Sequence, residues 1–199
     1  MNSFIQGFTV SGGLILAIGA QNAHVLKMGL TRQHVLPTVL ICAISDALLI
    51  GLGIGGMGAL LDQWPQAVRL ATWAGAAFLF WYSLSSLRAA FTRRSLQTAG
   101  DTPRTSLRAA VLMILAFTYL NPHTYLDTVV LIGSIGAHLA NGERLIFWLG
   151  CITASATWFT LLGFGAHKLS PLFAKPQSWR VLDALVGVGM GALAFNLVH

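Results

Sequence analysis

The sequence predicts an all-α polytopic membrane protein, and three observations support this class. Of the 199 residues, 55% are hydrophobic and only 9% are charged, whereas soluble domains carry about 25% charged residues. Several apolar stretches reach the roughly 20 residues that a helix needs to cross a hydrocarbon core of about 30 Å. The basic residues flank these stretches. A soluble fold is therefore excluded, and residues 1–199 are expected to form a single transmembrane transporter domain.

Six hydrophobic segments follow one another along the chain, and we expect five or six of them to span the membrane. They cover about residues 4–26, 36–61, 67–87, 109–139, 145–167 and 181–198. No Lys or Arg precedes the first segment, so it lacks the charged start of a signal peptide and is expected to be retained. Gly19 and the cluster Gln21-Asn22-Ala23-His24 interrupt this segment. It either crosses the membrane or dips into it.

The fourth segment is too long for one crossing. It has roughly 31 residues, where about 20 suffice, and Asn121-Pro122 lies in its middle. Proline removes a helical hydrogen bond and biases the preceding residue away from helical geometry. A helix break is therefore expected at Pro122, as one is at Gly19.

The two halves of the chain resemble each other. A polar connection, about residues 91–106, separates residues 1–90 from residues 107–199, and each half begins with an interrupted segment that contains Asn-x-His. With three crossings per half, the second half enters the membrane in the opposite sense. The sequence thus predicts two inverted three-helix repeats with broken first helices, an architecture typical of secondary transporters.

The distribution of basic residues predicts the orientation. Ten of the 12 Lys and Arg residues fall in the loops after the first, third and fifth segments, which places those loops in the cytoplasm and the C-terminus outside. These ten are Lys27, Arg32, Arg88, Arg93, Arg94, Arg104, Arg108, Lys168, Lys175 and Arg180. Topology accounts for the net charge of +6, so no nucleic-acid partner is expected.

Two carboxylates lie inside apolar segments. Asp46 is about ten residues, or roughly 15 Å, into its helix, and Asp127 follows the break in the fourth segment. A charge near the bilayer centre costs about 2.5–3.5 kcal/mol on insertion scales, so it usually serves a transport pathway. No Lys or Arg lies deep in any segment to pair with them. Their cation is expected to be a proton, a metal ion or a cationic solute.

The polar residues at the breaks supply complementary chemistry. Unpaired backbone N–H groups at an interrupted helix can hold an anionic group such as an α-carboxylate. Gln21, Asn22 and Asn121 can add hydrogen bonds, and His24 and His123 are secondary candidates. Their spacing does not match a metal site, so no metal or other cofactor is expected. The alternative for the amides is hydrogen bonding between helices.

Cys42 and Cys151 raise a different class, a thiol-disulfide carrier that passes electrons across the membrane. They occupy comparable segments of the two halves. Neither lies beside a proline or a second cysteine, and nothing nearby would activate a thiolate. This remains the alternative outside transport.

The motifs Gly19-Ala20-Gln21-Asn22, Asp46 and Leu120-Asn121-Pro122-His123, followed by Tyr125-Leu126-Asp127-Thr128, resemble the bacterial LysE/ArgO-type exporters of basic amino acids. The resemblance covers nearly the whole chain. It implies an inner-membrane exporter of L-lysine, L-arginine or both, driven by ion gradients, without ATP, enzymatic activity or a bound cofactor. Thr124 departs from the aliphatic residue expected there.

The residues favour the same substrate class. A basic amino acid offers a cationic tip to Asp46 and Asp127 and an α-carboxylate to the helix breaks, and protons can compete for the carboxylates. Self-association is compatible with the glycine-rich helix faces. A neutral amino-acid exporter would leave two costly carboxylates unexplained, and a divalent-cation exporter is the other transport alternative.

Overall fold

The computed structural model describes residues 2–16, 19–57, 65–91, 105–169, 171 and 176–198, which are almost entirely helical and contain no strand. The helices are α1 (Ser3–Ile15), α2 (Ala20–Thr31), α3 (Val35–Leu52), α5 (Pro65–Phe91), α6 (Leu107–Tyr119), α7 (Pro122–Tyr125), α8 (Gly133–Ala137), α9 (Asn141–Gly165) and α10 (Pro176–Val198). Two π-helical turns, η1 (Gly53–Met57) and η2 (Leu126–Ile132), and one 3-10 turn, η3 (Ala166–Leu169), complete the set. Most of the predicted basic connection, residues 92–104, lies outside this description.

The lengths of the helices confirm a polytopic membrane protein. Residues 35–56, 141–168 and 177–196 form helices long and apolar enough to cross a bilayer, and two bent helix pairs raise the number of candidate spans to five. The pairs are α1 with α2, and α6 with the helix that starts at Pro122. α5 is also long enough, with 27 residues, and it is less apolar.

The outer surface is suited to lipid. On α3, every fourth residue from 36 to 52 is a large apolar side chain with 44–57% of its surface exposed. A helix brings residues four apart onto one face, so these side chains form a continuous apolar stripe. Such a stripe is unfavourable in water and suits contact with hydrocarbon.

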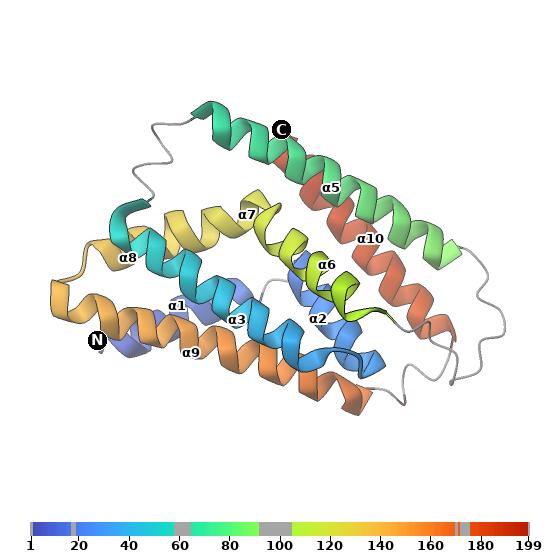
Figure 1. The fold of residues 1–199 in the computed structure, drawn as a ribbon, viewed down its shortest axis with the longest axis horizontal. Coiled ribbons are helices and arrows are strands. Elements are labelled where there is room, and N and C mark those ends of the chain that lie inside the picture. The colour runs from blue at the N-terminus through green and yellow to red at the C-terminus, as the bar shows by residue number, and fades with distance from the viewer. Residues whose placement is uncertain are drawn as a thin grey trace.

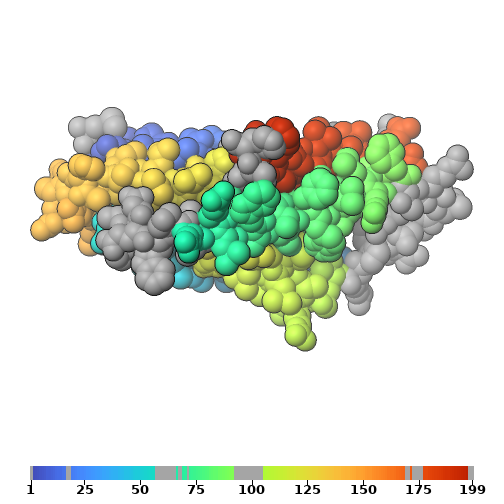
Figure 2. Space-filling view, turned by 90° about the horizontal axis from the view of Figure 1, so that it is seen from above, coloured from blue at the N-terminus to red at the C-terminus, as the bar shows by residue number. Residues whose placement is uncertain are grey.

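The helices pack in two groups that meet at the centre of the molecule (Figure 1). In one group α9 packs against both α1 and α3, and in the other α5 and α10 run side by side. α6 and α7 lie between the two groups. Seen from the side of α5, the molecule is an elongated slab with α5 along its face (Figure 2).

Both predicted breaks are present. α6 ends at Tyr119, and the helix that starts at Pro122 is inclined to α6 by 59°. In the first half, α2 begins after Gly19 and points 81° away from α1, across residues 17–18, which the structure does not describe. The breaks bring helix ends into the interior, where side chains must satisfy their backbone groups.

Two glycines permit a close backbone contact beside the second break. A Cβ atom on Gly133 would lie 2.6 Å from the Cα of Gly53, closer than real carbon contacts. Glycine at both positions therefore allows η1 and α8 to touch through their backbones. Gly56, with a φ of 97°, interrupts the helical geometry within η1 in a conformation that glycine adopts readily.

Candidate functional site

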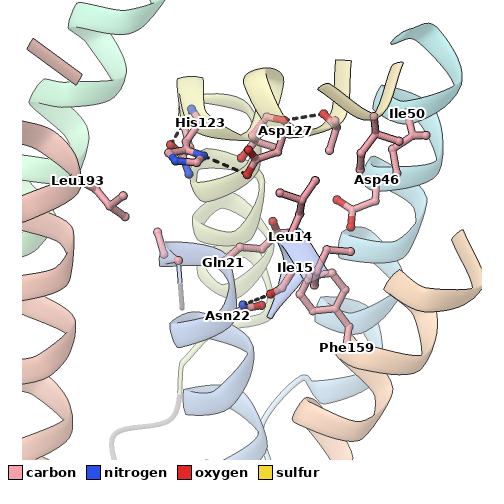
Figure 3. Close-up of a pocket in the computed structure, with 16 residues that line it drawn as sticks. Leu14, Ile15, Gln21, Asn22, Asp46, Ile50, His123, Asp127, Phe159 and Leu193 are labelled. Carbon is pink, nitrogen blue, oxygen red and sulfur yellow. Dashed lines mark hydrogen bonds and ion pairs between the residues drawn. The ribbon is translucent and has the colours of Figure 1, made fainter. Parts of the chain in front are cut away.

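A cavity of about 130 Å³ lies where the two helix breaks meet α3, and Figure 3 shows the side chains around it. This volume holds several water molecules. Its polar lining is Gln21, Asn22, Asp46, Asn121, His123, Thr124, Asp127 and Thr128. Its apolar lining includes Leu14, Ile15, Ile50, Ile132, Phe159 and Leu193. The fold thus brings together both carboxylates, all three amides, Gly19 and His123.

Asp46 is the buried carboxylate of the cavity. It projects from the middle of α3 and is 3% exposed. The hydroxyl of Ser155, on α9, donates a 2.6 Å hydrogen bond to Oδ2 of Asp46. Hydrogen bonds to an ionised acceptor are shorter and stronger than neutral ones, so this contact orients the carboxylate and stabilises its charged form.

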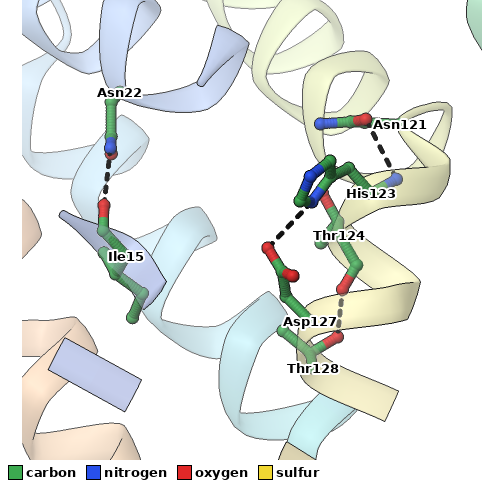
Figure 4. A network of polar contacts seen from close by, with 7 residues as sticks. All are labelled: Ile15, Asn22, Asn121, His123, Thr124, Asp127 and Thr128. Atoms are coloured by element: carbon green, nitrogen blue, oxygen red, sulfur yellow. Dashed lines mark hydrogen bonds and ion pairs between the residues drawn. The ribbon is translucent and has the colours of Figure 1, made fainter. Parts of the chain in front are cut away.

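Asp127 has a different environment. It lies in η2, its side chain is 30% exposed, and its Oδ2 accepts a hydrogen bond from Nδ1 of His123 at 3.0 Å. The His123 side chain is 52% exposed. His123 and Asp127 are four residues apart, so they lie on the same side of the helix and face each other at the cavity wall (Figure 4).

The first break is held by Asn22. Its Nδ2 donates to the carbonyl of Ile15, the last residue of α1, at 2.7 Å, and its Oδ1 accepts from Nε1 of Trp158 at 3.2 Å. Both ends of the amide are therefore engaged by the protein. Asn22 fastens the end of α1 to α2 and α9, as Figure 4 shows for the first of these contacts.

The second break is held by Asn121. Its Oδ1 accepts a hydrogen bond from the backbone N–H of His123 at 3.2 Å, which caps the helix that starts with Pro122. Pro122 needs no such partner because it has no N–H, and its fixed φ suits the first helical position. One turn further along, the Thr128 hydroxyl donates a 2.6 Å hydrogen bond to the backbone carbonyl of Thr124.

Gln21 is the amide whose donor is least well satisfied. Its Nε2 is buried and makes no hydrogen bond of regular geometry, although the side-chain amide lies within interaction range of the Asp46 carboxylate and the Cys42 thiol. Gln21 lies in the first turn of α2, whose N-cap, Gly19, provides no side-chain hydrogen bond. A buried donor without a regular hydrogen bond is costly, and this one lines the cavity beside a helix N-terminus. Both features suit an anionic group of a bound solute.

Two sequence-predicted residues lie elsewhere. His24 does not line the cavity; it is 4% exposed and packs on Phe117, with ring centroids 5.6 Å apart. Pro122 shapes the break without lining the cavity. The two thiols lie in separate apolar clusters, Cys42 among Val39 and Ile114 and Cys151 beside Phe147, so both act as packing groups.

Sequence reasoning missed several lining or supporting residues, and three of them are informative. Ser155 holds Asp46, while Phe159 and Leu193 close the cavity from α9 and α10. A lone serine in an apolar helix carries no distinctive signal, because its hydroxyl usually bonds to its own helix. Phe159 and Leu193 look like ordinary lipid-facing or core residues in the sequence.

Broken helices that enclose a polar cavity within an apolar helical bundle define a membrane translocator. The chain belongs to the LysE type translocator family, which it matches over residues 13–199. It is 43% identical to the "Arginine exporter protein ArgO" of Yersinia enterocolitica, over 98% of this chain and 96% of that protein. Proteins of the same name from Serratia proteamaculans and Photorhabdus laumondii are 43% and 40% identical, over 98% and 99% of this chain and 95% of each relative. No solved structure matches the chain.

Proposed function

We propose that this protein exports basic L-amino acids, arginine or lysine, across the bacterial inner membrane in exchange for protons. The observation that carries the proposal is the charge of the cavity. Asp46 and Asp127 both line it, and no Lys or Arg is among the lining residues that the structure describes. The relatives named as arginine exporters support the same substrate class.

The cavity offers partners for both ends of such a substrate. The guanidinium or ammonium tip is paired with the carboxylates of Asp46 and Asp127. The α-carboxylate is held by the Gln21 amide and the backbone N–H groups at the start of α2, where the helix dipole favours negative charge. Asn22 and Asn121 act mainly by holding the two breaks in place around the substrate.

Proton coupling follows from competition. A carboxylate can hold a proton or a cationic group, and the two exclude each other. A proton that enters from the outer side releases the amino acid there, and its loss to the cytoplasm restores the binding site. Export is then the exchange of an amino acid for a proton at the same carboxylates. In this proposal it needs no ATP and no bound cofactor.

The same proposal includes the inverted repeat and the orientation. The second helices of the two halves, α3 and α9, pack together, and so do the third helices, α5 and α10. The described ends next to the basic connections, those of α2, α5 and α9 and the starts of α6 and α10, gather at one end of the molecule (Figure 1). Both arrangements support two related halves with the basic loops in the cytoplasm and the C-terminus outside.

Export of labelled arginine, lysine and threonine from loaded cells tests the function. We expect both basic amino acids, or one of them, to leave faster than threonine, and a proton uncoupler to slow them. Faster export of threonine than of both basic amino acids would contradict the charge argument and favour a neutral amino-acid exporter.

A further inference from the structure

Asp127 has a histidine partner within the protein. Oδ2 of Asp127 lies 3.0 Å from Nδ1 of His123, which is the distance of a direct hydrogen bond. Histidine is the side chain whose ordinary titration changes its charge near neutral pH. The contact therefore becomes an ion pair when the imidazole carries a proton on both nitrogens.

The pair is also accessible from the cavity. The side chains of His123 and Asp127 are 52% and 30% exposed, and both line the cavity. A solute in the cavity can therefore contact either side chain. A guanidinium that reaches Asp127 from the cavity can replace the imidazole at the carboxylate.

Among the described residues, Asp46 has no histidine, lysine or arginine as a partner. The groups beside its carboxylate are the Ser155 hydroxyl, which donates to it, and the Gln21 amide, and neither carries a charge. The histidine of the first half, His24, is buried against Phe117 and does not line the cavity. Only the carboxylate of the second half, Asp127, thus has an imidazole partner that a substrate cation could replace among the described residues.

Few other ionisable groups face His123. Besides Asp127, the charged side chain among the described lining residues is Asp46 on α3. α5 and α6 also pack on α7. Their ionisable residues in the described ranges, none of which lines the cavity, are Arg69, Tyr82, Arg88, Arg108 and Tyr119. On α7 itself, Tyr125 donates its hydroxyl to the carbonyl of Tyr119 at 2.9 Å.

We propose that His123 is an internal competitor of the substrate at Asp127, and that its protonation from the outer side displaces the amino acid. This rests on the proposed export of basic amino acids. The imidazole takes up one proton, its Nδ1–H pairs with Oδ2 of Asp127, and the substrate leaves with its own charge. Loss of that proton to the cytoplasm weakens the pair and lets the next substrate bind. No covalent bond changes other than the N–H bond of the imidazole.

Arginine binding to the purified full-length protein, measured by calorimetry at pH 6 and pH 8, tests this role. Because coupled sites typically influence each other by about fivefold or more, wild-type affinity should be at least about fivefold weaker at pH 6. His123→Gln retains a hydrogen-bonding group without a charge, and should measurably reduce that difference, leaving the part that comes from direct proton competition at the two carboxylates. His123→Lys fixes a cation at Asp127, and should bind weakly at both pH values. His138→Gln is the matched control, because His138 is exposed, outside the cavity and bonded to its own helix through Ser134.

The outcomes separate the two proposals. If wild-type protein does not bind arginine or lysine, the export function is wrong and the role of His123 falls with it. If His123→Gln keeps the wild-type pH dependence, or His123→Lys binds like the wild type, the substrate proposal stands and the competitor role is overturned. Should His123→Gln fail to insert, the result for His123→Lys decides alone.

Discussion

Replacing Asp46 by asparagine should nearly abolish arginine export while the protein still inserts. Asparagine keeps the size of the side chain and an oxygen that accepts the hydrogen bond from Ser155, so the contact between α3 and α9 is retained. It removes the negative charge. At 4 Å and an effective dielectric constant of about 20, a pair of unit charges attracts by about 4 kcal/mol. That attraction corresponds to roughly a thousandfold in affinity, and burial of the site, with Asp46 3% exposed, limits its screening by salt.

Counterflow of labelled arginine in proteoliposomes measures this loss without an imposed gradient, so it reports binding and exchange together. Glu143→Gln is the matched control, because it removes an acidic group in the first turn of α9, outside the cavity. We expect near-complete loss in Asp46→Asn and wild-type rates in Glu143→Gln. Arginine export by Asp46→Asn at near wild-type rates, with unchanged pH dependence, would show that Asp46 is only a structural hydrogen-bonding group.

Three further predictions follow from other parts of the molecule. Asp127→Asn should also nearly abolish export from loaded cells, with the amount of inserted protein unchanged on a membrane blot; substantial remaining export would leave Asp46 as the sole cation site. Gly133→Ala should destabilise the purified protein by about 1–3 kcal/mol, seen as a lower Tm, because its Cβ would meet the backbone of η1 at 2.6 Å, whereas Gly142→Ala, with nothing within 4 Å, should not. Reporter fusions should be active in the cytoplasm near Gly100 and in the periplasm after His199; the opposite pattern would reverse the orientation.

The class, the two breaks and part of the polar lining of the cavity could be predicted from the sequence. Each depends on a strong physical signal. A carboxylate such as Asp46 is costly in an apolar helix, and proline at position 122 excludes a continuous helix. Interrupted helices bring polar residues to the interior, so residues at both breaks were expected near the carboxylates; Gln21, Asn22 and Asn121 line one cavity with Asp46 and Asp127, whereas His24 does not.

The two Asn-x-His motifs, however, do not place their histidines alike. Asn22 is the third residue of α2, whereas Asn121 precedes its helix as the N-cap. His24 is therefore turned toward α6, against Phe117, while His123 lies in the first helical turn and reaches Asp127. The direction of each histidine depends on its position relative to the first residue of its helix. That position depends on where the chain breaks, which a three-residue motif does not specify.

The π-helical turn that carries Asp127 was not foreseen either. A π-helix inserts one extra residue into a helical turn, and the surrounding apolar residues show no corresponding shift in hydrophobic pattern. In the structure, η2 packs against α3 and η1, and such tertiary contacts leave no pattern in the local sequence. Side chains after Thr128 therefore face other directions than a regular helix would give them.

The pairing of α5 with α10 has a consequence for how the protein is made. The Ser83 hydroxyl donates to the carbonyl of Gly187 at 2.6 Å, and Leu87 packs directly over that glycine. Residues 92–175 separate the two helices. A ribosome that adds about 5–20 residues per second needs about 4–17 s to synthesise this connecting stretch. During that interval the face of α5 that carries Ser83 and Leu87 has no α10 to pack against. The order of synthesis thus makes α10 the last of the described helices to become available for packing.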